Sequence, residues 1–505
     1  MPEETELKLS LRPEQAGRIG RHPVVQKLKS GPAETKRLLG TYYDTPDLLL
    51  RRKDVSLRVR EVDHRFIQTL KRMQPSRGAV FSRDEWETDV GGRDPDINEI
   101  EDGEIRRMLR KNGAAKSLRP MFRTDVRRTT WQLRDKDAEI ELALDIGEVR
   151  NENGDRTPIC EAELELKSGD ARRLYDIALA LNEKIDCVVG TVAKSDLGYA
   201  LYERKSSTPV KASKVPLVRD MTVWQAFETI CRSCLDQLEA NAPIARVGQD
   251  PEGIHQARVA NRRLRAAFKI FKRVLPQDRY ESFATELRWL QKELGDARDL
   301  DVFLDEMLDP MIERLPRERL LKAFRKRVKE ARLTAYARAR RALEGRRYGR
   351  LRLAFERWFA DAPGPDADPR LGRNVRWFAK RSIRKVHAKI VAVGIDLHDV
   401  SDAELHAIRI KGKQLRYCIE FFSGLFDGDG PRHHAKALSR IQDCLGSLND
   451  GVVAHTLIRK LGRKGSLDPR VKALVGGWFA ARIHDERANL GEAWGRFTAL
   501  RPFWV

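Results

Sequence analysis

Segments of the first 205 residues alternate charged and apolar side chains, which is the pattern of β-strands that carry one charged face. The first is Glu4-Thr5-Glu6-Leu7-Lys8, in which Glu4, Glu6 and Lys8 share one side. The alternation returns in segments 56–60, 66–71, 83–87, 139–146 and 160–167. A face exposed to water would explain one such strand alone, but its repetition restricts the fold to a sheet with one charged side.

These charged faces are sorted by sign from one segment to the next. If the sheet closes on itself with the charged faces inward, they line a polar tunnel. Such an interior is stable only when opposite charges, metal ions or a bound anion compensate one another. Carboxylates are ligands for Mg²⁺ or Mn²⁺, and basic side chains donate to phosphate oxygens, so a metal–phosphate site is predicted. Acids stand at Glu4, Glu6, Asp145, Glu161 and Glu163, and bases at Lys8, Arg58, Arg60, Lys71 and Arg128.

Further motifs follow the opening Glu4-x-Glu6-x-Lys8 in a fixed order. They are Tyr43-Asp44-Thr45-Pro46, Leu57-Arg58-Val59-Arg60, Thr69-Leu70-Lys71, Arg83-x-Glu85, Glu161-x-Glu163-x-Glu165 and Ala193-Lys194-Ser195. Together they resemble the CYTH domain of the triphosphate tunnel metalloenzymes. The resemblance implies an eight-stranded antiparallel β tunnel that binds triphosphate compounds together with Mg²⁺ or Mn²⁺.

The resemblance also implies residue roles. Glu4, Glu6 and Lys8 are the expected catalytic residues. The expected metal ligands are Glu4, Glu6, Asp145, Glu161 and Glu163, and the expected substrate-binding residues are Lys8, Arg58, Arg60, Lys71, Arg83, Arg128 and Lys194. Two assignments stay open, because a shift of one residue reverses the face of a strand: Arg123 or Arg127 could replace Arg128, and Glu165 could exchange roles with Glu161.

The expected reaction is metal-dependent hydrolysis of inorganic triphosphate to pyrophosphate and phosphate. No Ser/His/Asp or Cys/His pattern indicates a covalent nucleophile, and no P-loop is present. Thiamine triphosphatase and adenylate cyclase are alternatives on the same tunnel, because the motifs recognise only the triphosphate. The absence of an obvious aromatic pocket favours the inorganic substrate.

A second domain is indicated by charge and by a linker. The first 205 residues are nearly balanced, so almost all of the net charge of +22 lies in the remainder. Residues 206–216 are rich in Ser, Pro and Lys and separate a first domain, 1–205, from a second, 217–505. The six cysteines are too sparse for a disulfide framework, and no apolar run could span a bilayer. A cytoplasmic protein without a membrane partner is expected.

The second domain shows helical periodicity, so the fold class is α+β followed by all-α. On one predicted helix His255, Arg258, Arg262 and Arg265 lie within a stripe about 80° wide. A second stripe, 151 positions later, contains His406, Arg409, Lys413 and Arg416. Segments 290–299 and 441–450 match at the same offset, which predicts an internal duplication of about 222–350 and 373–505. Two helical bundles with both stripes facing one groove are expected.

A third basic stripe is formed by Arg373, Arg376, Lys380, Arg384 and His387. The duplicated helices and the Leu-Gly-x-x-x-Asp segments resemble the CHAD domain over residues 216–505, a module often found after CYTH. The resemblance implies binding of inorganic polyphosphate along the three stripes and suggests association with polyphosphate granules.

A different interpretation is a non-catalytic scaffold that binds nucleic acid or polyphosphate. Aromatic residues are only 7% of the chain, and the stripes contain no interleaved Tyr, Phe or Trp for base stacking, which disfavours nucleic acid. Nothing in the sequence specifies an oligomeric state.

Overall fold

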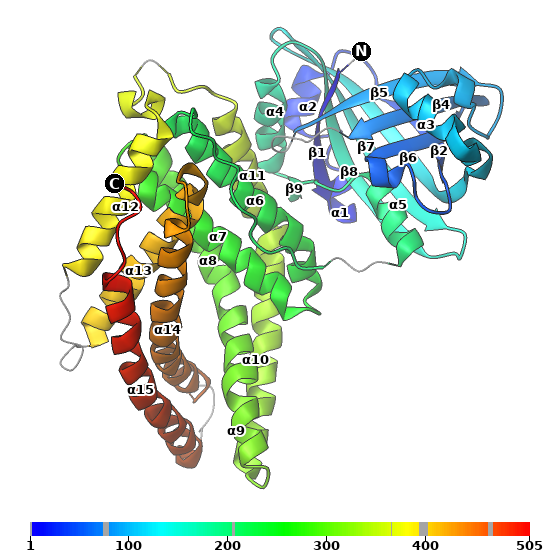
Figure 1. The fold of residues 1–505 in the computed structure, drawn as a ribbon. Coiled ribbons are helices and arrows are strands. Elements are labelled where there is room, and N and C mark those ends of the chain that lie inside the picture. Colours follow the sequence, from blue (N-terminus) through cyan, green and yellow to red (C-terminus); the bar gives the residue numbers. More distant parts are fainter. Residues whose placement is uncertain (1–2, 74–79, 205–207, 365, 393–401, 463–467) are drawn as a thin grey trace. The chain divides into compact units, whose positions relative to one another are not determined.

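The computed structural model describes residues 3–73, 80–204, 208–364, 366–392, 402–462 and 468–505 (Figure 1). Contacts divide the chain into two compact units. The first contains Met1–Thr208 and Leu343–Ala362, and the second contains Pro209–Ala342 and Pro363–Val505. Within the described ranges, no helix is both long and apolar enough to cross a membrane.

The first unit is built on an antiparallel sheet, as predicted. Its described strands are β1 (Glu3–Leu11), β2 (Glu34–Asp44), β3 (Val55–Val62), β4 (Arg65–Met73), β5 (Val80–Val90), β6 (Arg119–Asp135), β7 (Ala138–Asn151), β8 (Arg156–Ser168) and β9 (Cys187–Val189). Their order is β5-β4-β3-β2-β6-β7-β8-β1-β9, and β1 also pairs with β5. This extra pairing, which aligns Glu3–Leu7 with Val80–Asp84, brings eight strands around one cavity.

The alternating sequence gives the strands two different faces. Leu7 and Leu9 of β1 and Leu164 of β8 are fully buried in an apolar core outside the ring, where α4 (Arg172–Asn182) covers the sheet. A second apolar cluster packs Leu57 of β3 beneath α3 (Gly103–Arg110). Burial of the apolar face therefore turns the charged face inward.

Short elements complete the N-terminal part of this unit. They are α1 (Pro13–Ala16), α2 (Pro23–Leu28), α5 (Lys194–Glu203) and the 3₁₀ turns at Arg51–Lys53, Ile97–Glu99 and Lys111–Ser117. Helix α5 packs on β6, β7 and β8. Its first residue is Lys194, so the start of this helix places a cation at the sheet.

A helix from far along the chain also belongs to the first unit. Helix α11 (Arg346–Phe359) lies within the region expected to form the helical domain, yet it packs on α4 and β9. Leu353 is fully buried in the core of the sheet, and Arg357 Nε donates to Asp176 Oδ1 of α4 at 2.7 Å. Gly349 lies so close to β9 that an added Cβ would be 1.9 Å from the Cys187 carbonyl oxygen.

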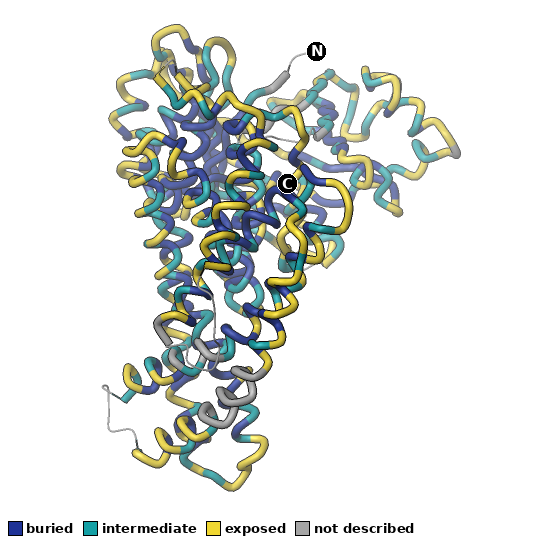
Figure 2. Tube along the Cα trace, turned by 60° about the vertical axis from the view of Figure 1, so that its left-hand side comes forward, coloured by how far each residue is buried: buried dark blue, intermediate teal, exposed yellow. Residues whose placement is uncertain are grey.

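The second unit is helical, as predicted. Its main helices are α6 (Val223–Val247), α7 (Pro251–Phe271), α8 (Gln277–Val302), α9 (Asp309–Arg314), α10 (Arg319–Glu344), α12 (Val375–Val391), α13 (Asp402–Phe422), α14 (Gly430–Gly462) and α15 (Pro469–Thr498). A π-helical turn at Phe303–Leu308 joins α8 to α9, and 3₁₀ turns occupy Pro369–Gly372 and Ser423–Leu425. Buried and exposed positions alternate along these helices, as amphipathic packing requires (Figure 2).

The starts of the two expected repeats meet. Thr222 and Asn374, which cap the starts of α6 and α12, form an antiparallel β-bridge. The bridge is reciprocal: the Val223 amide donates to the Arg373 carbonyl at 2.8 Å, and the Val375 amide donates to the Met221 carbonyl at 2.9 Å. This local two-fold arrangement is the geometry that an internal duplication would produce.

Candidate active site and anion-binding surface

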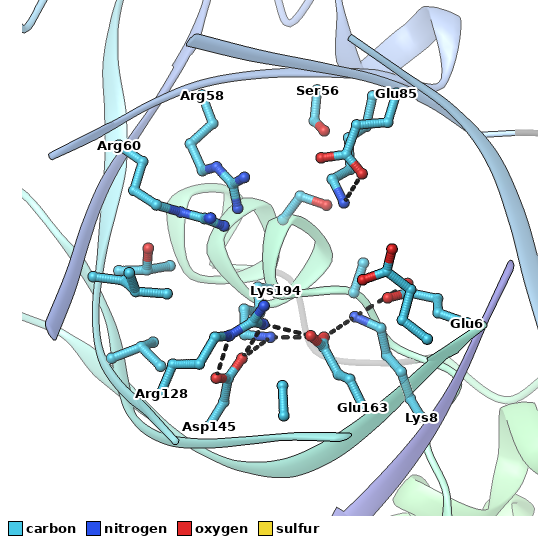
Figure 3. A pocket seen from close by; sticks show the side chains of 18 of the residues that line it. Glu6, Lys8, Ser56, Arg58, Arg60, Glu85, Arg128, Asp145, Glu163 and Lys194 are labelled. Carbon is cyan, nitrogen blue, oxygen red and sulfur yellow. Dashed lines mark hydrogen bonds and ion pairs between the residues drawn. The ribbon is translucent and has the colours of Figure 1, made fainter. Parts of the chain in front are cut away.

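The inward faces of the first unit surround a cavity of about 700 Å³. Its lining side chains come from strands on all sides of the ring and from the start of α5 (Figure 3). The charged residues that line it are Glu6, Lys8, Arg58, Arg60, Lys71, Glu85, Glu87, Arg128, Glu141, Asp145, Glu163, Glu165, Lys167 and Lys194.

One side of the cavity holds a compact group of carboxylates. Asp145 of β7 and Glu161 and Glu163 of β8 are buried, and each offers an oxygen within 4.8 Å of the others. Lys194 Nζ lies 2.7 Å from Asp145 and 2.9 Å from Glu163, and Lys8 Nζ lies 2.8 Å from Glu163. The two ammonium groups offset the repulsion among three neighbouring carboxylates.

The pKa of Glu163 reflects this balance. Burial alone would raise it, but Lys194, Lys8 and Arg128 together hold the pKa of Glu163 well below its usual range. The pKa of Asp145 is lowered in the same way, against burial, by Lys194 and Arg128. Both carboxylates are therefore ionised at neutral pH and available as oxygen ligands.

Cations dominate the opposite side of the cavity. Figure 3 shows Arg58 and Arg60 across the cavity from Asp145 and Glu163. Arg60 has no hydrogen-bond or ion-pair partner among the residues that the structure describes, and burial, with Arg58 and Arg128 close by, lowers its pKa to about 10. Arg58 forms an ion pair with Glu87 at 3.8 Å, so Arg60 is the guanidinium of this pair that is left to attract an incoming anion.

The carboxylate side fits a hard divalent cation. Three carboxylates that converge within 4.8 Å supply the oxygen ligands that Mg²⁺ and Mn²⁺ prefer. Lys8 and Lys194 now occupy the space around these oxygens and supply the compensating positive charge. Asp145, Glu161 and Glu163 thus form, among the described side chains, a group that could hold a metal ion.

Most of the predicted tunnel residues are brought together. Glu6, Lys8, Arg58, Arg60, Lys71, Arg128, Asp145, Glu163 and Lys194 line the cavity, and Glu161 contacts Lys194 beside it. The side chains of Glu4 and Arg83 lie outside those described, although the backbone pairing sets the two residues opposite each other in β1 and β5.

The two open assignments have clear geometries. Arg128 lines the cavity, whereas Arg123 and Arg127 are exposed. Glu165 also lines the cavity and forms an ion pair with Lys167, while Glu161 contacts Lys194. Both glutamates therefore point to the inward side of β8.

The second unit brings its two repeated stripes together. Arg262 Nε of α7 donates to the Tyr417 hydroxyl of α13 at 2.6 Å. Beside this contact is a cavity of about 330 Å³, whose basic lining residues are Arg262, Arg265, Lys269, Arg288 and Lys413. Burial first, and then Arg409, Arg262 and Arg416, lower the pKa of Lys413 to about 7. The two stripes thus form one concentrated cationic site.

The remaining stripe residues have other positions. Arg258 Nη1 lies 2.5 Å from Asp299 and donates to the Gly295 carbonyl at 3.1 Å, so it is held against α8. His255 is half-buried, and burial with nearby Arg298 lowers its pKa, whereas His406 is exposed.

The third stripe does not line this cavity. Arg373, just before α12, and Arg384 of α12 are exposed, and Arg376 is partly buried. Lys380 Nζ donates to the Val505 carbonyl at 2.8 Å. The expectation that no aromatic residue accompanies the stripes is wrong here, because the Arg373 guanidinium lies 4.9 Å from the ring centroid of Trp377.

Some site residues were not among the sequence candidates. Lys269 follows Arg265 by four residues and continues the α7 stripe, so its spacing alone could have identified it as a member of the stripe. Arg288 of α8 and Tyr417 reach the cavity only through helix packing. In the tunnel, Tyr42 of β2 also lines the cavity; it directly precedes the Tyr43-Asp44-Thr45-Pro46 motif but was not a site candidate.

Two family models match the chain in the order that its residues predict. The CYTH domain matches residues 2–185 and the CHAD domain matches residues 229–459. A curated relative from Haemophilus influenzae, an inorganic triphosphatase, is 29% identical over 211 residues, which are 41% of this chain and 57% of that protein. This chain therefore aligns with little more than half of that relative.

One solved structure supports the CHAD assignment. The crystal structure of the CHAD domain from the plant Ricinus communis has 30% sequence identity and a TM-score of 0.52, and the match covers 59% of this chain and 98% of that one. A protein from Hippeastrum, described as a putative adenylyl cyclase with a dominant triphosphatase activity, matches 40% of this chain and 95% of its own length. Its 18% identity and TM-score of 0.29 are too low to carry an argument.

Proposed function

Because the chain belongs to the CHAD family and carries a CYTH domain ahead of its CHAD domain, we propose that it hydrolyses inorganic triphosphate with a divalent metal and binds inorganic polyphosphate through its helical unit. The observation that carries the first part is the division of the tunnel into two sides: buried Asp145 and Glu163 lie opposite Arg58 and Arg60, and Glu161 lies beside these two carboxylates. A triphosphate would be held between a metal-binding side and a cationic side.

In this proposal the chain's own residues bind and orient the substrate. Arg58, Arg60 and Lys71 donate to phosphate oxygens, and Lys8 and Lys194 share their charge between the carboxylates and the substrate. Arg83 and Arg128 complete the basic set. Because each cation is held by the sheet or by α5 before substrate arrives, little reorganisation accompanies binding.

Asp145, Glu161 and Glu163, together with Glu4 and Glu6, would hold Mg²⁺ or Mn²⁺. A bound divalent ion neutralises phosphate charge and lowers the pKa of an attacking water. Glu6 is 3% exposed and lies 3.7 Å from Lys8, so its carboxylate is positioned inside the tunnel to accept the proton of that water. No covalent intermediate is required.

The activity is tested by phosphate release from tripolyphosphate, ATP, thiamine triphosphate and long-chain polyphosphate, each with Mg²⁺, with Mn²⁺ and with EDTA. We expect metal-dependent release that is fastest from tripolyphosphate. Glu6→Gln and Lys8→Met should each lower kcat/KM by at least about a hundredfold. Glu139→Gln, at an exposed position of β7, is the matched control and should retain full activity. Faster release from ATP or thiamine triphosphate would replace the proposed substrate, and no release would overturn the hydrolase.

The second part of the proposal rests on the cationic site between α7 and α13. A cavity lined by Arg262, Arg265, Lys269, Arg288 and Lys413 supplies multiple phosphate donors. Competition between labelled single-stranded DNA and long-chain polyphosphate, at equal phosphate concentration and in EDTA, tests the ligand. Polyphosphate should displace DNA, and the paired substitution Arg262→Met, Lys413→Met should weaken polyphosphate binding. Preferential retention of DNA would overturn the polyphosphate assignment. A cytoplasmic location at polyphosphate granules is part of the same proposal.

A further inference from the structure

Tyr42 presents a phenol to the tunnel that neither the motif analysis nor the proposed metal chemistry uses. It lies on β2, lines the 700 Å³ cavity and is only 5% exposed. Its ring stacks on Phe122 with centroids 4.7 Å apart and planes inclined by 22°. The ring is therefore held in place before any ligand binds.

The neighbouring phenols have structural partners. Tyr43, one residue along β2, faces the other side of the strand and donates to the Arg93 carbonyl at 2.8 Å. Tyr199 of α5 donates to Asp44 at 2.9 Å. In contrast, no residue in the described part of the chain accepts a hydrogen bond from the Tyr42 hydroxyl. Tyr42 thus has an available donor inside a polar cavity.

The charges around Tyr42 come mostly from the phosphate side of the tunnel. The Arg58 guanidinium carbon lies 6.0 Å from the ring centroid. Although burial opposes the shift, Arg58, Lys194, Arg60 and Lys71 lower the pKa of the Tyr42 phenol. An acidified phenol is a stronger hydrogen-bond donor, and here it is surrounded by the cations expected to attract phosphate.

We propose that the Tyr42 hydroxyl is a further substrate-binding group, which donates a hydrogen bond to a phosphate oxygen of a triphosphate held by Arg58 and Arg60. The inference rests on the proposed function of the tunnel as a triphosphate site. The cations bind the anion mainly through charge, and the Tyr42 hydroxyl, on a ring held against Phe122, adds a neutral donor at one more position. Tyr42 would therefore add to the affinity of the tunnel for the phosphate chain.

This role makes ligand binding depend on the protonation state of the phenol. Ionised Tyr42 has no proton to donate and carries a negative charge that repels phosphate. The titratable groups that face it are Arg58 and Arg60 of β3, Lys71 of β4, and Lys194 and Tyr199 of α5. Arg60, with a pKa of about 10, also titrates in the alkaline range. The contribution of Tyr42 to the pH dependence of binding is therefore measured as the difference between the wild-type protein and Tyr42→Phe, which lacks only the hydroxyl.

The test is binding of tripolyphosphate to the full-length protein by calorimetry in EDTA, followed by kinetics with Mg²⁺. Tyr42→Phe keeps the ring that stacks on Phe122 and removes the donor. Tyr43→Phe removes an equivalent hydroxyl from the outer face and is the matched control. We expect Tyr42→Phe to bind about tenfold to a hundredfold more weakly at pH 7.5, with unchanged affinity in Tyr43→Phe.

The pH profile separates substrate binding from a structural role. The affinity advantage of the wild-type protein over Tyr42→Phe should shrink as pH rises and the phenol ionises. Equal affinity of the two proteins at pH 7.5, or a constant advantage at all pH values, would overturn the inference. If the wild-type protein binds tripolyphosphate but does not hydrolyse it, the hydrolase proposal is overturned, and the comparison with Tyr42→Phe still tests the role of Tyr42. If the wild-type protein does not bind tripolyphosphate, both proposals are overturned.

Discussion

Arg128 holds Asp145 by two parallel hydrogen bonds, from Nε to Oδ1 at 2.8 Å and from Nη2 to Oδ2 at 2.6 Å. Asp145 is fully buried, and the same guanidinium also contacts Glu163. A cation from β6 thus neutralises two of the carboxylates proposed to bind metal, which links the stability of the sheet to the chemistry of the tunnel.

Substitution of this arginine should therefore affect both properties. Arg128→Met leaves Asp145 and Glu163 with less compensation, so we expect destabilisation of about 3 kcal/mol and weaker tripolyphosphate binding. Urea unfolding and steady-state kinetics measure the two effects. Arg37→Met is the matched control, because Arg37 forms the same two-bond pair with Asp125, at 3.0 and 2.7 Å, but is 68% exposed. Equal destabilisation by both substitutions would contradict a special role for the buried pair.

Acid should destabilise the first unit through the same carboxylates. The folded-state pKa values of Asp145 and Glu163 are lowered, so their stabilising contribution is complete above the unfolded value of about 4 and is lost as pH falls through the lower folded values. Glu163→Gln should be less stable than wild type at pH 7, and the difference should shrink below about pH 4. Thermal unfolding between pH 7 and 2.5 measures this convergence. A difference that is constant with pH would contradict the linkage.

Polyphosphate binding should strengthen as pH falls through neutrality. Lys413, with a pKa of about 7, is largely uncharged at pH 8.5 and gains a proton below pH 7, when it adds to the charge of Arg262, Arg409 and Arg416. Affinity measured by calorimetry from pH 8.5 to 6 should rise, and Lys413→Met should reduce this rise. Lys322→Met, at an exposed position of α10, serves as the control. An unchanged pH dependence in Lys413→Met would show that Lys413 does not cause the effect.

Close packing of α11 should make the first unit sensitive to the size of residue 349. Gly349→Val would place side-chain atoms where only 1.9 Å separates an added Cβ from the Cys187 carbonyl, so we expect destabilisation of at least about 2 kcal/mol. Gly103→Ala, where an added Cβ meets nothing within 4 Å, is the control in the same unit. Unfolding followed by near-ultraviolet circular dichroism measures both variants. Wild-type stability in Gly349→Val would show that α11 can shift away from β9.

The sequence was sufficient to predict the architecture of the tunnel and most of its lining. Alternation with a period of two assigns each side chain to one face of its strand. Because Leu7, Leu57 and Leu164 are buried on the apolar face, outside the ring of strands, the charged face lies inside the ring. The choice among Arg123, Arg127 and Arg128 could not be made with equal certainty, because it depends on register. In the structure Arg128 pairs with Asp145 directly across β6 and β7.

In the second unit, helical periodicity predicted less of the site than strand alternation did in the first. It indicated the α7 and α13 stripes, and the offset between them indicated their shared site. It could not distinguish α12, whose basic face does not line that cavity, because a helical stripe carries no information about the neighbouring helix. Likewise Arg288 joins the cavity only through the packing of α8 on α7.

The position of α11 limits how this protein can be divided. A gene fragment that stops at the linker would encode every strand of the tunnel but leave out Leu353, which is fully buried in the core against those strands. The two activities proposed here are therefore not interchangeable modules: recombination at the linker would transfer an incomplete hydrolase. If this chain arose by fusion of a complete tunnel domain with a complete helical domain, the tunnel domain must later have come to depend on residues of α11, which the helical segment of the gene encodes.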